Sequence, residues 1–226
     1  MKHTPLTILA IFSLALVGCG DTQTTSDEPQ SAEEAQQEYA DQLESGEAQG
    51  PPPMPAGEYE AYAEAGGHIV MEIPASTDDE LIAEIEDYRE QIGAEPVTYL
   101  IADVDNREGS DSIGMRKVKV FDAEGVEYEF TDAADLIEEW GPSYTSDYEN
   151  VMPDGTVLTI EENKAISQAE RDLLDNLTGS VSAAGRGTII LIHEGTDLPN
   201  EFTRVAVQPG PFGEEVEAYP TDWNTQ

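Results

Sequence analysis

Hydrophobic and polar positions divide the chain into three regions. The first has a mostly apolar run of 12 residues, Leu6 to Val17, behind the basic start Met1-Lys2-His3. The second, from Gly20 to Gly66, contains 12 carboxylates and no Lys or Arg. The third begins near His68 and shows the spacing of strands and helices. This pattern predicts a short apolar leader, a polar linker and a folded region.

Strand signals dominate the folded region. β-Branched and aromatic residues gather in short runs bounded by Gly, Pro or Asp, which is typical of strands. The expected strands cover residues 68–73, 96–104, 115–121, 126–130, 188–193 and 201–207. The turn Asp122–Gly125 makes the third and fourth of them a β-hairpin. The run 188–193 is almost entirely apolar, which predicts a central strand that is buried on both faces.

Three other segments have helical spacing. Apolar residues fall on one face between Thr77, an expected N-cap, and Gly93, an expected stop. A shorter helix follows Asp132 and ends before Gly141, and the longest helix covers about 159–177. Strands and helices are mixed in one chain without internal repeats, which indicates an α+β fold.

The end of the apolar leader carries a candidate modification site. Leu16-Val17-Gly18-Cys19 resembles the lipidation motif of bacterial lipoproteins, and Cys19 is the only Cys of the chain. The resemblance implies a signal peptide over residues 1–18, cleavage between Gly18 and Cys19, and a diacylglyceryl thioether on Cys19. Two acyl chains suffice for stable anchoring. We therefore expect a protein held on the extracytoplasmic face of the cell membrane.

Charge excludes some partners and helps to set the domain boundaries. The chain has 48 acidic and 10 basic residues, a net charge of −38. Such a surface repels phosphate backbones, so nucleic acid is not an expected partner. Residues 19–66 are expected to be a disordered tether, and the Pro- and Gly-rich residues 209–226 a loosely held tail. Residues 67–208 remain as the globular domain.

Three segments of the folded region resemble a bacterial immunoglobulin-like family. They are Tyr99–Asn106 at a strand end, Asp122–Gly125 in the hairpin, and Ala184–Leu191 leading into an apolar strand. The family contains secreted antigens and lipoproteins of unknown function, mostly from Gram-positive bacteria. The resemblance covers about Pro96 to Gln208 and implies an immunoglobulin-like β-sandwich with inserted helices. Residues 68–93 would form a strand–helix preface outside that sandwich.

The loop after the strand 96–104 has the best pattern for a metal ion. Asp103, Asp105 and Asp111 offer carboxylate oxygens, the ligands that a hard cation such as Ca²⁺ prefers. The spacing differs from an EF-hand, because Gly114 stands where a bidentate Glu belongs. A solvated loop without metal is the alternative, and no other cofactor is indicated.

Trp140, Tyr144 and Tyr148 are candidates for an aromatic binding patch. In the alternative, Trp140 belongs to the helix core and the two tyrosines cover it. Motifs for nucleophilic or zinc catalysis are missing from the sequence: it has no G-x-S-x-G turn, no HExxH and no P-loop.

These features favour a non-enzymatic binding or scaffolding module whose partner is an envelope protein or ligand that the sequence does not identify. Two alternatives stay open: a carboxylate-dependent envelope hydrolase and a calcium-dependent surface binding module. A pocket holding two close acids, one with a raised pKa, would favour the hydrolase. A flat aromatic patch would favour binding.

Overall fold

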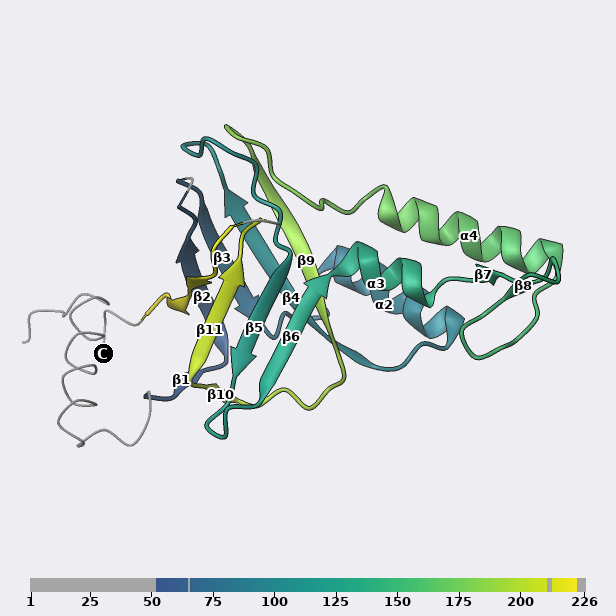
Figure 1. Cartoon of the computed structure of the whole chain (residues 1–226), viewed down its shortest axis with the longest axis horizontal. Coiled ribbons are helices and arrows are strands. Elements are labelled where there is room, and N and C mark those ends of the chain that lie inside the picture. Colours follow the sequence, from purple (N-terminus) through teal and green to yellow (C-terminus); the bar gives the residue numbers. More distant parts are fainter. Residues whose placement is uncertain (1–51, 65, 211–212, 223–226) are drawn as a thin grey trace, which may run out of the picture.

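A computed structural model describes residues 52–64, 66–210 and 213–222. The expected signal peptide, Gly18, Cys19 and residues 20–51 lie outside the described residues. Within the described part, nine strands form one antiparallel sheet accompanied by three helices (Figure 1). The fold is therefore a β-rich α+β fold. Each described helix falls short of the length and apolar character that crossing a bilayer requires.

The strands of the sheet are β2 (Gly57–Tyr62), β3 (His68–Ile73), β4 (Val97–Asp105), β5 (Lys117–Phe121), β6 (Glu127–Asp132), β9 (Arg186–Glu194), β11 (Arg204–Gln208), β12 (Val216–Glu217) and β13 (Tyr219–Pro220). Their order is β12-β11-β5-β6-β9-β4-β3-β2-β13. Two short pairs lie outside it: β1 (Met54–Pro55) with β10 (Glu201–Phe202), and β7 (Ser143–Tyr144) with β8 (Asn150–Val151). The helices are α2 (Glu80–Ile92), α3 (Ala133–Trp140) and α4 (Ile160–Leu174).

Capping residues in the sequence set the helix boundaries. Asp79, rather than the expected Thr77, caps α2, because its side chain accepts hydrogen bonds from two backbone N–H groups. Gly93 ends α2 with a φ of 73°, a left-handed conformation that glycine adopts without a Cβ clash. Asp132 caps α3, and Thr159 begins a capping box at the start of α4.

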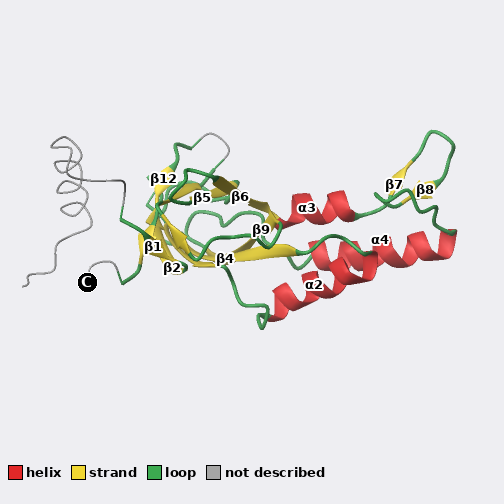
Figure 2. Ribbon diagram, turned by 90° about the horizontal axis from the view of Figure 1, so that it is seen from below, coloured by secondary structure: helices red, strands yellow, loops and turns green. Residues whose placement is uncertain are grey.

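The sheet separates an inner core from an outer core. Side chains of the inner core include Tyr59, Ile69, Met71, Leu100, Val118, Val120, Phe130, Leu191, Phe202 and Val205. On β4 and β9 the alternate residues, among them Tyr99 and Ile190, pack against the helices instead. The two strands are thus buried on both faces, which confirms the central position predicted from the apolar run 188–193. Figure 2 shows the helices extending from one side of the curled sheet.

Residues 216–220 join the two edges of the sheet. β12 pairs with β11 at one edge and β13 pairs with β2 at the other, with only Ala218 between them. Ala218 is fully buried, and its N–H donates to the carbonyl oxygen of Val205 at 2.9 Å. The sheet is therefore nearly closed. The expectation of a loosely held tail over 209–226 was wrong for this segment, because both sheet edges offer it backbone partners.

The fold also begins before the expected boundary at residue 67. β2 pairs with β3 along its whole length, and it places Tyr59 and Ala61 in the inner core. The Tyr59 ring packs against the Phe202 ring, with 6.0 Å between their centroids. β2 therefore belongs to the fold and not to the expected tether. The acidic residues that alternate with these apolar positions face outward, which is why composition alone concealed the strand.

The strand order does not confirm an immunoglobulin-like sandwich of two facing sheets. Hydrogen-bonded pairing runs without a break from β12 to β13 in one sheet. β3, which was expected in a preface outside the sandwich, lies between β2 and β4 within that sheet. The helices α3 and α4 are inserted between β6 and β9, which leaves them free to extend away from the sheet (Figure 1).

Candidate functional site

The three aspartates of the predicted metal loop have different surroundings. Asp105 forms salt bridges with Arg107 at 2.8 Å and Arg186 at 2.6 Å. Hydrogen bonds from these two guanidinium groups hold the pKa of the Asp105 carboxyl well below its usual range. Asp103 accepts a hydrogen bond from a β9 hydroxyl at 2.7 Å, and Asp111 lines a cavity. Within the described ranges, no group of three or more His, Cys, Asp or Glu is placed to hold a metal ion.

Asn106 fixes the conformation of this loop. It is fully buried, and its Nδ2 donates to the carbonyl oxygens of Asp111 at 2.8 Å and Val181 at 3.0 Å. Asp105 meanwhile faces Arg186 on the paired strand β9, and its carboxylate forms an ion pair with that guanidinium group. The loop between β4 and β5 is therefore held by hydrogen bonds and an ion pair. It does not bring the three predicted metal ligands together.

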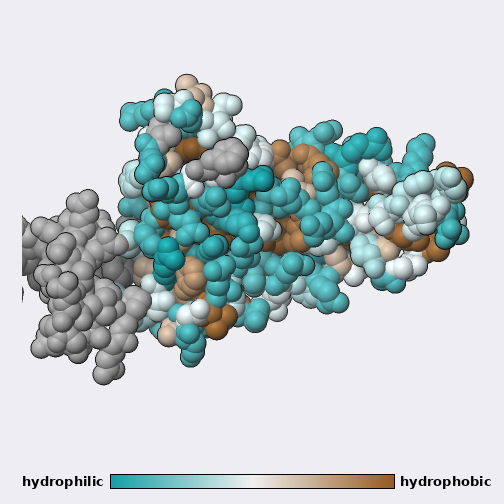
Figure 3. Space-filling view, viewed as in Figure 1, coloured by the Kyte–Doolittle hydropathy of each residue, from teal (hydrophilic) through white to brown (hydrophobic). Residues whose placement is uncertain are grey.

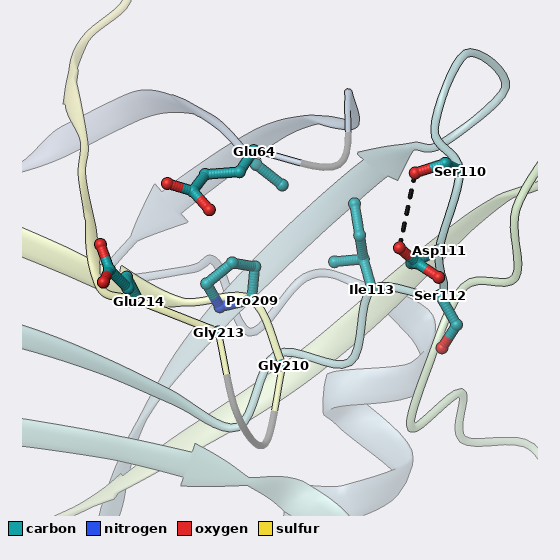
Figure 4. Close-up of a pocket in the computed structure, with 10 residues that line it drawn as sticks. Glu64, Ser110, Asp111, Ser112, Ile113, Pro209, Gly210, Gly213 and Glu214 are labelled. Atoms are coloured by element: carbon teal, nitrogen blue, oxygen red, sulfur yellow. Dashed lines mark hydrogen bonds between the residues drawn. The ribbon is translucent and has the colours of Figure 1, made fainter.

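Loops at one end of the sheet enclose a cavity of about 580 Å³ (Figure 4). It is lined by Ala63, Glu64, Ser110, Asp111, Ser112, Ile113, Pro209, Gly210, Gly213 and Glu214. Figure 4 shows Glu64 and Glu214 on one wall and Asp111 on the other, where Ser110 donates a hydrogen bond to it. The lining is acidic, but its carboxylates stand apart and form no ligand cluster.

Trp140 lies in the outer core and not on the surface. Its exposed fraction is 8 %, and it packs with Leu136 and Ile137 of α3. It also contributes to the wall of a second cavity of about 380 Å³ between the helices and the sheet. The alternative reading of Trp140 as helix core therefore describes its position, and Trp140 is not part of an exposed patch.

Tyr144 and Tyr148 stand at the end of an arm. α3 leads away from the sheet, the β7–β8 hairpin lies at the far end, and α4 returns (Figures 1 and 2). The exposed fractions of Tyr144 and Tyr148 are 65 % and 82 %. Their rings meet edge to face, with 6.2 Å between the centroids. Two of the three predicted patch residues thus form an exposed aromatic pair.

Two further apolar residues share this end of the arm. Val157 bridges to Val151 of β8, and Ile160 is the first residue of α4 and is 80 % exposed. Six large hydrophobic side chains are exposed among the described residues, and four of them are Tyr144, Tyr148, Val157 and Ile160. We call these four the hairpin tip. Figure 3 shows hydrophobic residues, coloured brown, at this end of the surface.

Sequence reasoning missed Val157 and Ile160. Ile160 directly follows the N-cap of α4, and it lies off the inward face of Ile166, Ala169 and Leu173 that the helix pattern defines. An apolar residue on the polar face of an amphipathic helix was the available signal.

The backbone of the hairpin tip is ordered by hydrogen bonds. The Thr145 N–H donates to the carbonyl oxygen of Glu149 at 2.9 Å, and the Tyr148 N–H donates to that of Thr145 at 3.1 Å. Tyr148 has a φ of 67°, a left-handed conformation that costs a non-glycine residue about 1 kcal/mol. Such residues are concentrated at functional sites. The hairpin therefore holds the Tyr148 ring in an exposed position at some cost in stability.

Two acids that interact with each other, Glu138 of α3 and Glu170 of α4, lie elsewhere. Burial, and then the negative charge of Glu138, raise the pKa of Glu170 in α4. Neither residue lines either of the two cavities described above. The pair belongs to the contact between α3 and α4.

Replacing Glu170 with Gln is expected to stabilise the protein at neutral pH. A raised pKa means that folding favours the protonated form. Protonated Glu170 therefore makes its full contribution to stability at pH values below the pKa of this group in the unfolded chain. That contribution is lost as the pH rises through its pKa in the folded protein. At pH 7 the variant should gain about 0.5 kcal/mol, the scale of a removed like-charge pair on helices.

The measurement is urea unfolding of both proteins at about pH 7 and about pH 4. The gain of Glu170→Gln should disappear at the lower pH, because Glu170 of the native chain is then protonated as well. An equal gain at both pH values would show that the substitution acts through packing and not through charge.

No protein-family model, curated protein or solved structure matches this chain.

Proposed function

We propose that the protein is a non-enzymatic binding module, held on the outer face of the cell membrane by a lipid on Cys19, which contacts an envelope partner through the hairpin tip. The observation that carries the proposal is the concentration of four of the six exposed large hydrophobic side chains at the end of one arm. Clustered apolar groups in water mark interaction sites more often than isolated ones do. Tyrosine is enriched at interfaces, since it adds large contact area at low entropic cost.

The shape of the molecule supports this role. The hairpin tip lies at one end, and the described chain begins beside β1 at the opposite end (Figure 1). The proposed anchor at Cys19 precedes residue 52 in the sequence, so the chain enters the fold at the end opposite the tip. The net charge of −38 repels anionic headgroups, so the two acyl chains on Cys19 supply the membrane affinity. The immunoglobulin-like relationship stays a prediction beside this proposal.

Replacing Cys19 with Ala is expected to release the protein from membranes. Without the thioether the chain has no acyl chains, and its acidic surface does not bind anionic lipid. The check is membrane fractionation of cells that express either form, followed by detection of the protein in pellet and supernatant. Retention of Cys19→Ala in the membrane pellet would contradict the lipid anchor.

The binding role is tested by a double variant, Tyr144→Ser with Tyr148→Asn. Asn tolerates positive φ, so the hairpin should keep its fold while both rings are lost. Envelope proteins retained on the immobilised variant should fall by about tenfold or more, as expected when central aromatic residues are removed from an interface. Thermal unfolding should match that of the native chain.

Tyr62→Ser is the matched control, because Tyr62 is also 65 % exposed but lies on β2 in the sheet. It should leave the retained proteins unchanged. Equal retention by the double variant and the control would contradict a binding role for the tip. Repeating the assay with a calcium chelator separates the calcium-dependent alternative, in which retention would be lost for every form of the protein.

A further inference from the structure

The charges around the hairpin tip are mostly negative, the exception being Lys164, one turn of α4 beyond Ile160. Residues 143–162 contain five carboxylates and no Lys or Arg. They are Asp147, Glu149, Asp154, Glu161 and Glu162, and all five are exposed. An apolar surface with this rim repels acidic partners and attracts basic ones.

Two of these carboxylates are held in the ionised form by the fold. The backbone N–H of Thr156 donates to Asp154 at 2.8 Å, and that of Thr159 donates to Glu162 at 2.8 Å. These hydrogen bonds lower the pKa of both carboxyls. These two carboxylates therefore stay ionised to a lower pH than an ordinary carboxyl group does.

The position of the other carboxylates suits a cationic side chain. Asp147 and Glu149 flank Tyr148 in the sequence, and the Tyr148 ring meets Tyr144 edge to face. Arg and Lys bind aromatic faces through the ring quadrupole, lay their aliphatic stems on apolar surface and pair with carboxylates. A tip with tyrosine rings, apolar neighbours and acids meets all three needs.

Other occupants fit less well. A membrane surface with anionic headgroups and a second copy of this chain, with its net charge of −38, both bring negative charge to a negative rim. A neutral apolar partner would gain nothing from five carboxylates. We infer that the partner of the hairpin tip is a basic segment of an extracytoplasmic protein, with Arg or Lys against the tyrosine rings. This inference rests on the proposed function.

The test uses a fluorescent peptide of about 12 residues in which Arg alternates with Ser, added to the mature lipid-free chain in detergent-free buffer. Peptides with Glu or Gln in place of Arg serve as ligand controls. The Arg peptide should bind, and binding should weaken as NaCl rises from about 50 mM to about 300 mM, because salt screens exposed charges. The Glu peptide should not bind.

Variants locate the binding. Tyr144→Ser with Tyr148→Asn should weaken it about fivefold to thirtyfold, which corresponds to two cation–π contacts. Asp147→Asn with Glu149→Gln should weaken it about threefold to tenfold, which corresponds to two exposed ion pairs. The matched control is Glu84→Gln with Asp87→Asn, which removes the same two charges from exposed positions on α2 and should leave binding nearly unchanged.

Equal weakening by the α2 control and the tip charge variant would overturn the inference, because binding would then follow net charge alone. Binding of the Gln peptide as tightly as the Arg peptide would also overturn it. So would tip-dependent binding of phosphatidylglycerol vesicles, which would assign the tip to a membrane surface.

The two levels of the proposal fail separately. The tyrosine double variant could retain fewer envelope proteins than the native chain and yet bind the Arg peptide equally well. In that case the binding role stands and the basic partner is wrong. If the double variant retains the envelope proteins and binds the Arg peptide as the native chain does, the tip is not a binding surface.

Discussion

Replacing Ala218 with Asp should lower the free energy of unfolding by at least about 4 kcal/mol, because it places an unpaired carboxylate in a site shielded from solvent. Ala218 is fully buried in the inner core, between the two short strands that join the sheet edges. A carboxylate there either disrupts the pairing of β12 and β13 or stays buried at high cost. Most of the stability of an ordinary domain would be lost.

The measurement is equilibrium unfolding in urea, compared with Ala123→Asp in the exposed turn between β5 and β6. The control should change the free energy by no more than about 0.5 kcal/mol, as exposed substitutions usually do. If residues 216–220 were a loosely held tail, Ala218→Asp and Ala123→Asp would change the free energy of unfolding by similar amounts. A small effect of Ala218→Asp would therefore contradict closure of the sheet by residues 216–220.

Replacing Tyr59 with Ala should cost about 3–5 kcal/mol, the range measured when large buried aromatic residues are removed. The Tyr59 side chain is fully buried, its ring packs against Phe202, and its hydroxyl donates to the carbonyl oxygen of Pro55 at 2.7 Å. Removing the Tyr59 side chain leaves a cavity in the inner core and eliminates the hydrogen bond that links β2 to β1.

Two companion variants separate these contributions in the same unfolding assay. Tyr59→Phe keeps the ring and should cost about 1 kcal/mol, the net value of one hydrogen bond. Tyr62→Ala, on the exposed face of the same strand, should cost at most about 1 kcal/mol. If Tyr59→Ala were no more costly than Tyr62→Ala, residues 57–62 would belong to a tether after all.

The regular interior of the fold could be predicted from the sequence because its signals are local. The apolar run 188–193 indicates a strand buried on both faces, and β9 has that position. The helices α2, α3 and α4 follow from capping residues and apolar periodicity. These patterns depend only on residues within a few positions of each other.

The sheet edges could not be predicted in the same way. β12 and β13 have two residues each, too few for any periodicity, and their partners lie far away in the sequence. β2 does alternate between acidic and inward positions, but it lies in a stretch whose composition is that of a disordered segment. At both edges of the sheet, hydrogen-bonded pairing with strands distant in the sequence orders segments whose local sequence does not predict a strand.

The candidate site was predicted in part. Tyr144 and Tyr148 are exposed together, whereas Trp140 is buried because it lies on the apolar face of α3. The aspartate loop looked like a cation site because Arg186, the partner of Asp105, stands 81 residues later. Only the pairing of β4 with β9 brings that positive charge to the loop.

A photo-reactive phenylalanine analogue in place of Tyr148, in the lipid-anchored protein in whole cells, tests the binding role most directly. Position 126 is the control, because Val126 is another exposed hydrophobic residue but lies on the β5–β6 turn. Irradiation should yield a discrete adduct from position 148 and little from position 126, and the adduct should fade in the Asp147→Asn, Glu149→Gln background. Equal adducts from both positions, or none from position 148 in membrane-held protein, would contradict binding through the hairpin tip.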